Sequence, residues 1–192
     1  MANYTVIPQA LFEDMQLDAG ILLSDFDPSE VTSSSPGYTD TDIICATTGG
    51  IHITCVPTYS DLFEDVDNAP MNTKEGKHLD GWECKIAFTG LGTSVDQIKL
   101  ALGVADITAA SGKVTPRRSL AQTDFGDLWW VGDKAGGGYV AVHLLNALST
   151  SGLDLQTTKN GKGQIEIELT GHVSINAQGT VPMEFYSADA QT

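Results

Sequence analysis

The chain has few cysteines, and their arrangement excludes the usual cysteine-based sites. Its 192 residues include 3 cysteines, Cys45, Cys55 and Cys84. They form neither a CxxC pair nor the Cys/His spacing of a zinc site. An odd number of scattered cysteines is typical of reduced thiols that pack as small hydrophobic side chains. We therefore expect no metal and no disulfide.

Positive charge and long apolar runs are also scarce. Lys and Arg number 10 against 25 Asp and Glu, which gives a formal net charge of −15. Binding to nucleic acid through its phosphates needs clustered positive charge, so the composition argues against it. No apolar run is long enough to span a membrane, and Met1 to Thr5 lack the basic and apolar regions of a signal peptide. We expect a protein whose synthesis ends in the cytoplasm and which makes no membrane contact.

Motifs of enzyme chemistry are missing as well. No Gly-Lys pair is followed by Ser or Thr as in a phosphate-binding loop, and no GxSxG elbow is present. The four histidines are far apart in the sequence. Glu166 and Glu168 lie two apart on one strand face, without an apolar pocket to separate their pKa values. The sequence predicts no catalytic residue and no cofactor.

Short segments of period two, separated by Gly, Pro, Asn and Asp, fill the chain from residue 40 onward. This pattern indicates a mainly β fold, a β-sandwich or partly open barrel. The adjacent Trp129 and Trp130 predict a strand with both faces covered, by this chain's own core and by a second layer or a neighbouring subunit. Residues 139–145 are apolar on both faces except for His143, which predicts a second central strand.

Two glycines, Gly49 and Gly50, predict a two-residue turn in a hairpin over residues 41–56. That register would place Ile44 and Ile53 in the core and Cys45 and Cys55 on opposite faces. Residues 57–81 are acidic and without period, which predicts a long loop, either mobile or ordered by contacts outside its own domain.

Later in the chain, a capping pair of Ser94 and Gln97 with Gly103 predicts one short amphipathic helix over about 94–103. Residues 164–170 alternate most regularly, and Pro182 suggests that the last strand, 181–186, lies at an edge. The predicted core side chains are Ile44, Ile53, Trp82, Trp129, Trp130, Ile165, Ile167 and Leu169.

Five stretches in order resemble the tail tube (major tail) protein of long-tailed bacteriophages, in the type common in phages and prophages of Gram-positive hosts. The resemblance covers about residues 40–186. The stretches are DIICATTGG at 42–50, DVDNAP at 65–70, DLWWVGD at 127–133, NALST at 146–150 and TGH at 170–172.

The resemblance implies a structural virion protein whose subunits form hexameric rings that stack into a tube, assembled in the host cytoplasm. DNA would pass through this tube during ejection without specific binding. Further partners implied are a tape-measure protein and a tail-assembly chaperone. The resemblance implies a tail-tube domain at 40–186, followed by a short tail at 187–192. It does not reach the N-terminal segment at 1–39, whose role stays open and for which we expect subunit contacts.

Within this picture, the acidic loop becomes an arm that is ordered by a neighbouring subunit. Its candidate contact residues are Asp61, Phe63, Glu64, Asp65, Asp67, Asn68 and Pro70. A negatively charged lumen would repel DNA. The candidate residues that face the lumen are Asp40, Asp42, Glu166 and Glu168.

Other functions remain open from the residues alone. A tail terminator or a head decoration protein could share the fold class. A monomeric carbohydrate-binding sandwich could use Trp129 and Trp130 as a stacking platform. A small β-fold hydrolase would need clustered His, Ser and carboxylate residues that the sequence does not display.

Overall fold

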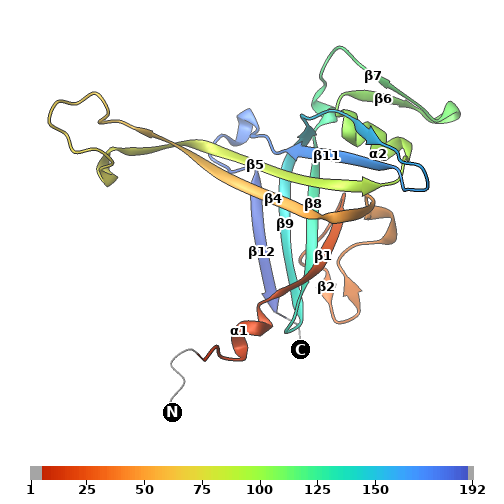
Figure 1. The fold of residues 1–192 in the computed structure, drawn as a ribbon, viewed down its shortest axis with the longest axis horizontal. Helices are drawn as coiled ribbons and strands as arrows, with labels where there is room; N and C mark the ends of the chain where they lie inside the picture. The colour runs from red at the N-terminus through yellow and green to blue at the C-terminus, as the bar shows by residue number, and fades with distance from the viewer. Residues whose placement is uncertain (1–5, 190–192) are drawn as a thin grey trace.

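The computed structural model describes residues 6–189 and shows two antiparallel layers packed face to face (Figure 1). The first sheet has the strand order β1-β8-β9-β12, and the second has the order β4-β5-β11-β10. The strands of the first sheet are β1 (Gln16–Leu23), β8 (Gly126–Lys134), β9 (Gly138–Ser149) and β12 (Met183–Asp189). Those of the second are β4 (Ala46–Asp61), β5 (Lys77–Leu91), β10 (Asp154–Gln156) and β11 (Gln164–Thr170).

Strand β9 joins the two sheets, because its last residues, Leu148 and Ser149, pair with Thr170 and Leu169 of β11. Both sheets remain open at their outer edges, so the fold is a sandwich and not a closed barrel. As predicted, β8 and β9 are central strands and β12, which follows Pro182, is an edge strand that pairs with β9.

Short elements complete the chain. Among residues 6–189, the one helix of more than a single turn is α2. Its position confirms the prediction from Ser94 and Gly103, because the Ser94 hydroxyl accepts a hydrogen bond from the Gln97 amide and Gly103 ends the helix. The helices are α1 (Ala10–Glu13), α2 (Val95–Leu102), η1 (Asp40–Asp42), η2 (Lys74–Gly76), η3 (Ala109–Ser111), η4 (Gln122–Asp124) and η5 (Ile175–Ala177). Two small ribbons pair β2 (Val31–Thr32) with β3 (Ser35–Pro36) and β6 (Ala105–Thr108) with β7 (Lys113–Pro116).

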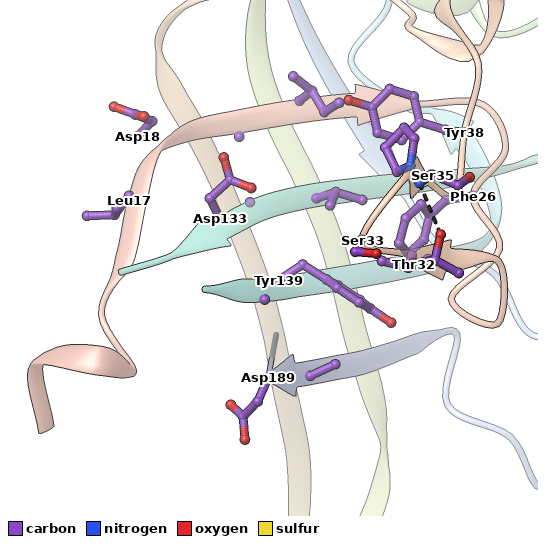
Figure 2. A pocket seen from close by; sticks show the side chains of 18 of the residues that line it. Leu17, Asp18, Phe26, Thr32, Ser33, Ser35, Tyr38, Asp133, Tyr139 and Asp189 are labelled. Carbon is purple, nitrogen blue, oxygen red and sulfur yellow. Dashed lines mark hydrogen bonds between the residues drawn. The ribbon is translucent and has the colours of Figure 1, made fainter. Parts of the chain in front are cut away.

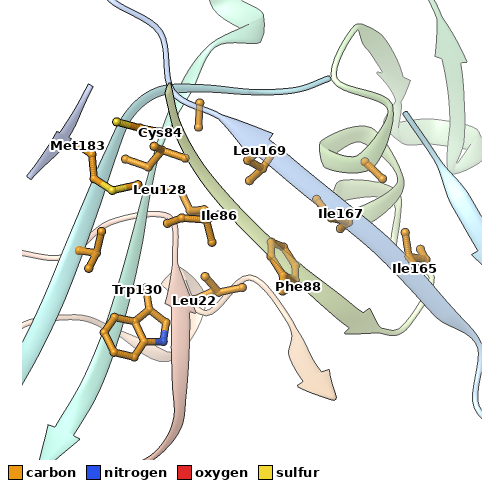
Figure 3. Packing of buried hydrophobic residues seen from close by; sticks show 14 residues of the cluster. Leu22, Cys84, Ile86, Phe88, Leu128, Trp130, Ile165, Ile167, Leu169 and Met183 are labelled. Atoms are coloured by element: carbon orange, nitrogen blue, oxygen red, sulfur yellow. The ribbon is translucent and has the colours of Figure 1, made fainter. Parts of the chain in front are cut away.

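The main core lies between the two sheets (Figure 3). Alternate side chains of β5 and β11 point into it and meet side chains of the first sheet, as period-two strands require. Ile165, Ile167 and Leu169 are buried, and Ile44 and Ile53 are half-buried against the same cluster. The prediction of a core position was wrong for Trp82, which is 39% exposed because β5 extends beyond the first sheet there.

Both faces of β8 are covered, as the tryptophan pair predicts. Trp130 faces the main core, whereas Trp129 lies on the opposite face of the first sheet in a second cluster. Phe26 and Tyr38, from the segment between β1 and η1, help to cover that face. Residues 16–38 are therefore an integral part of the sandwich, which corrects their assignment to a separate N-terminal segment.

The predicted Gly49-Gly50 turn was wrong, because β4 runs straight through it. Both glycines have positive φ, 79° and 87°, but they form an irregularity in a continuous strand between the pairs Thr48↔Thr89 and Ile51↔Phe88. The partner strand is β5 and not residues 41–48. Ile51, Ile53 and Cys55 consequently share the core face, and Cys45 packs against the same core.

The prediction of an acidic loop over residues 57–81 was also wrong at both ends of that segment. Residues 57–61 and 77–81 extend the β4–β5 ladder as far as the pair Asp61↔Lys77. The connection between the strands is limited to residues 62–76. These end portions of the strands lack alternation because no second sheet covers either face there.

A backbone irregularity in β1 ties this strand to Trp130. Asp18 and Gly20 have positive φ, 56° and 69°, where the register with β8 shifts between Leu17 and Ile21. The resulting path brings the Ala19 carbonyl to the Trp130 indole, which donates a hydrogen bond of 2.9 Å. A Cβ on Gly20 would lie 2.5 Å from the Val131 carbonyl oxygen and 2.6 Å from Trp130 Nε1.

We therefore expect Gly20→Ala to lower the free energy of unfolding by about 2–5 kcal/mol, from the strained φ together with the collision. Urea denaturation measures this loss. Gly112→Ala is the matched control, because Gly112 has φ of 62° but open space around it, and should cost only about 1–2 kcal/mol. Equal losses in the two variants would contradict the role of the close approach to Trp130.

Candidate assembly surfaces

Residues 56–83 form an arm that projects from the body as the outer half of the β4–β5 hairpin (Figure 1). The ladder leaves the core beyond the pair Cys55↔Cys84, where Cys84 is fully buried. Its tip is shaped by Asp61, whose carboxylate accepts the Phe63 amide at 3.1 Å and pairs with Lys77 at 3.3 Å. The pKa of Asp61 is lowered, mainly by the hydrogen bond from the Phe63 amide and to a lesser extent by Lys77.

The arm carries large apolar side chains in contact with solvent. Met71 is 91% exposed, Leu62 is 62% and Val66 is 52%. The exposed apolar residues of the arm are Val56, Tyr59, Leu62, Phe63, Val66, Met71, Leu79 and Trp82. So large an apolar surface on one projection is typical of a protein contact surface.

The structure brings together at the tip the residues predicted for the inter-subunit loop. Of these, Glu64, Asp65, Asp67 and Asn68 are exposed. Asp61 instead holds the start of the tip, because its carboxylate accepts the hydrogen bond from the Phe63 amide. Sequence reasoning missed the apolar partners Leu62, Val66 and Met71. Their signal was present, since these large apolar side chains lie in an acidic segment without strand or helix period.

A second apolar surface lies at the N-terminal segment, residues 6–17. No residue of α1 is buried. The exposed large apolar side chains here are Val6, Ile7, Leu11, Phe12, Met15 and Leu17. The segment is held to the body by amides of Ala135 and Gly136, which donate to the carbonyls of Met15 and Glu13 at 2.8 and 2.9 Å.

Lys134 anchors this segment to the end of β12. Its side chain is only 5% exposed, and Nζ lies 2.9 Å from an Asp14 carboxylate oxygen and 2.7 Å from one of Asp189. The hydrogen bond to Asp189, followed by that to Asp14, raises the pKa of Lys134. The same ammonium group lowers the pKa of Asp189.

The outer face of the second sheet is acidic. Glu166 is exposed on β11 opposite Asp154 of β10, and Glu168 follows on the same face. Lys85 of β5 lies between carboxylates, 2.6 Å from Glu83 and 3.4 Å from Glu168. The pKa of Lys85 is raised, mainly by the hydrogen bond to Glu83 and to a lesser extent by the charge of Glu168. Lys85 thus pairs with two of these carboxylates, Glu83 and Glu168, and with neither Glu166 nor Asp154.

Asp40 and Asp42, also predicted to face the lumen, lie on a different element. They form η1, which attaches to β1 through the Ser24 amide and the Asp42 carbonyl at 2.8 Å. The Asp42 carboxylate accepts the Thr39 hydroxyl at 2.6 Å and the Thr39 amide at 2.7 Å. These bonds lower its pKa and give Asp42 a capping role. An orientation toward a lumen stays a prediction for all four acidic residues.

Unpaired edges within the described part of the chain include those of β4 and β12. β4 pairs with β5 alone over its 16 residues, and β12 pairs with β9 alone over its 7. An edge of this kind presents free backbone N–H and C=O groups to a strand from another chain.

A cavity of about 680 Å³ lies between β1 and the β2–β3 ribbon on the outer face of the first sheet. Figure 2 shows aromatic side chains of Phe26, Tyr38 and Tyr139 at one side and carboxylates of Asp18, Asp133 and Asp189 at the other. Within residues 6–189 no three His, Cys, Asp or Glu side chains come together as a metal site. No histidine lines the cavity as a base for its serines.

His143 is a packed histidine. Its ring stacks on Trp129 with centroids 3.9 Å apart, and it lies 3.5 Å from Asp127 and 3.4 Å from Glu184. The Tyr186 hydroxyl donates to Glu184 at 2.7 Å and, with His143, lowers the pKa of Glu184. The stack on Trp129 and the contact of Nδ1 with Glu184 hold the ring in place, while the buried Nε2 has no hydrogen-bond partner among the described residues.

Comparison with known proteins finds no matching family model and no similar curated protein. Among solved structures, similar chains come from the virion of a native gene transfer agent particle (12% identity, TM-score 0.42, covering 88% of this chain and 95% of that one) and from the tail of an empty gene transfer agent particle with C6 symmetry (13%, 0.43, 88% and 96%). A third comes from the tube-terminating cap of the anti-feeding prophage (12%, 0.42, 98% and 95%).

The three chains are parts of a virion, a tail and a tube-terminating cap. Nothing in them bears on a Gram-positive host. At TM-scores below 0.5 these similarities do not place the chain in a family. No described helix has the length and apolar character needed to cross a membrane.

The Lys134 anchor yields a test by amide hydrogen exchange. We expect Lys134→Met to speed exchange at Ala135 and Gly136 severalfold, because the attachment of the N-terminal segment loses its ion pairs. In the unmodified protein, the contribution of Asp189 is present above the ordinary carboxyl pKa of about 3.9 and is lost as pH falls through its lowered value. The contribution of Lys134 is lost only above about pH 10.4.

The attachment should thus hold at neutral pH and weaken in acid, below about pH 4. Lys85→Met is the matched control, since it removes an equally paired lysine from the other sheet. Unchanged protection at Ala135 and Gly136 in Lys134→Met would refute the anchoring role.

Proposed function

We propose that this chain is a structural subunit of a phage-type tail tube, which stacks as hexameric rings around a channel for DNA. The observation that carries this proposal is the arm, a projecting hairpin covered with exposed apolar side chains. The resemblance of five sequence stretches to tail tube proteins supports the same function.

The arm is built to be completed by another protein. An isolated two-stranded hairpin is marginally stable in water, and this one has no sheet against either face. Burying side chains such as Leu62, Val66 and Met71 would stabilise a contact by roughly 1.5–3 kcal/mol each. A second copy of the chain fits as the partner, because a heterologous contact repeated between copies builds rings and stacks.

The open edges of β4 and β12 supply the lateral contacts. Pairing between the edge strand of one subunit and that of a neighbour would continue the β-structure around a ring. The N-terminal segment offers a further apolar contact. Contacts with a tape-measure protein and a chaperone remain predictions of the resemblance.

The acidic outer face of the second sheet is the surface that we assign to the channel. With −15 on each subunit, a hexameric ring would carry about −90, and DNA carries one negative charge per ~1.7 Å of its axis. Glu166 and Glu168 would then repel passing DNA and so prevent its retention on the wall.

The competing carbohydrate-binding module loses its main support. Trp129 is 7% exposed and Trp130 is 9% exposed, so neither ring offers a face on which a sugar could stack. A tube subunit has a structural role, which requires no catalytic group.

The first test addresses the arm. We expect concentrated wild-type protein to form rings or hollow tubes in negative-stain electron microscopy, and Val66→Asp with Met71→Asp to prevent them, because a charge at each position opposes apolar burial. The melting temperature should change by no more than about 2 °C, since both side chains are exposed.

Leu120→Asp is the control, a charge placed on an apolar side chain that is 53% exposed outside the arm. Tubes formed by the double variant, or lost equally in the control, would contradict the role of the arm. A wild-type protein that stays monomeric at high concentration by light scattering would contradict self-assembly.

The second test addresses the channel face. Tubes carrying Glu166→Lys and Glu168→Lys should retain DNA at about 50 mM salt and release it near 200 mM, because the reversed charges pair with phosphates. Tubes carrying Asp25→Lys and Glu30→Lys, an equal change of charge on exposed residues away from β11, should not retain DNA inside. Fluorescent DNA trapped during assembly and counted after nuclease digestion of outside DNA distinguishes the two.

If both variant tubes, or neither of them, retained DNA that nuclease cannot digest, the β11 face would not be the channel surface.

A further inference from the structure

Cys55 and Cys84 face each other at the base of the arm. They are partners in the β4–β5 ladder, and their Sγ atoms lie 3.1 Å apart. Cys84 points into the main core (Figure 3), and Cys55 is half-buried against the same cluster. The next ladder partners toward the tip, Val56 and Glu83, are exposed, so the two thiols mark the point where the hairpin leaves the body.

The backbone around this pair suits a covalent link. Residues directly opposite each other in antiparallel strands have Cα atoms about 4.5 or 5.5 Å apart, and disulfides span roughly 4.4–6.8 Å between Cα atoms. The sulfur atoms need to approach by about 1 Å to reach the bond length near 2.05 Å. Cys45 precedes β4 and lies over Gly90, away from this ladder position.

We propose that Cys55 and Cys84 form an oxidation site, at which an oxidant of the disulfide class converts the two thiols into an intrachain disulfide that closes the base of the arm.

The exchange balances in two steps. The Cys55 thiolate attacks one sulfur of the oxidant, which forms a mixed disulfide and releases the first thiolate, which takes up a proton. Cys84 Sγ then attacks Cys55 Sγ and displaces the second thiolate, which takes up the proton lost by Cys84. Two electrons and two protons thus pass to the oxidant, which becomes two thiols.

Burial decides the order of attack. Desolvation, with the adjacent Cys55, raises the pKa of Cys84 to about 12, so the half-buried Cys55 attacks first. Once Cys55 is in the mixed disulfide, its repulsion of a Cys84 thiolate is gone. The contact between the two sulfurs then makes the second step intramolecular, which compensates for the small thiolate fraction of Cys84.

The bond would restrain the arm directly. It joins residues 29 apart in sequence and encloses the whole arm in a loop. The arm's ladder could then open only from the tip, and the unfolded chain would lose conformational freedom.

The test uses the full chain, purified reduced and then treated with excess oxidised glutathione. Thiols titrated after denaturation should fall from 3 to 1 per chain, the mass should fall by about 2 Da, and a peptide containing Cys55 should be linked to one containing Cys84. The melting temperature should rise by about 5–10 °C, and the rise should disappear after reduction.

Cys45→Ser is the matched control and should lose two thiols and gain the same thermal shift. Cys55→Ser and Cys84→Ala should form no intrachain bond; Cys55 is half-buried, so its variant keeps the test valid if Cys84→Ala fails to fold. Three free thiols after treatment, a stable glutathione adduct, a bond that includes Cys45, or a disulfide between chains would each overturn the proposal.

Discussion

The burial of alternate β5 side chains between the two sheets fixes most of this structure. Cys84, Ile86 and Phe88 point inward against the first sheet, and their register with β11 places Ile167 and Leu169 beside them. The same two strands, β4 and β5, continue beyond Cys84 without a covering sheet. The boundary between body and arm is thus a change of burial along one unbroken ladder, and no hinge or linker separates them.

This boundary explains which parts of the fold the sequence could predict. Period-two alternation arises only where one face of a strand is buried and the other is wet. β11 satisfies that condition and its bounds were predicted without error, and the doubly covered β8 was recognisable from Trp129 and Trp130. The arm is wet on both faces, so its strand portions carry no period and were predicted as loop.

Two further differences between the predicted and the observed strands arise at glycines. Positive φ at Gly49 and Gly50 was foreseen, but a sequence cannot say whether such residues reverse the chain or only interrupt a strand, because the partner strand decides this. In β1, Asp18 and Gly20 break the alternation, so the strand was missed. Its role is visible only when Trp130, more than a hundred residues later, donates its indole N–H to Ala19.

The candidate surfaces were predictable to different degrees for a related reason. Glu166 and Glu168 share a face because a strand alternates, which the sequence states directly. Asp40 and Asp42 have the same charge and similar spacing, yet they lie in a 3₁₀ turn where Thr39 engages the Asp42 carboxylate. Charge alone therefore does not show whether acidic residues share a surface. The secondary-structure element on which the residues lie decides this.

The distribution of charge and apolar surface suggests how a strongly acidic subunit could still associate. A net charge of −15 opposes the approach of identical chains. The arm carries Leu62, Val66 and Met71 away from the acidic face around Glu166, although Glu64, Asp65 and Asp67 lie beside them at the tip. Repulsion between exposed charges falls off over about 10 Å at 0.1 M salt, whereas an apolar contact acts at the point where it forms. In the proposed tube, contact through a long projection would let association proceed while the face around Glu166 keeps its charge, which is the combination that a repulsive channel requires.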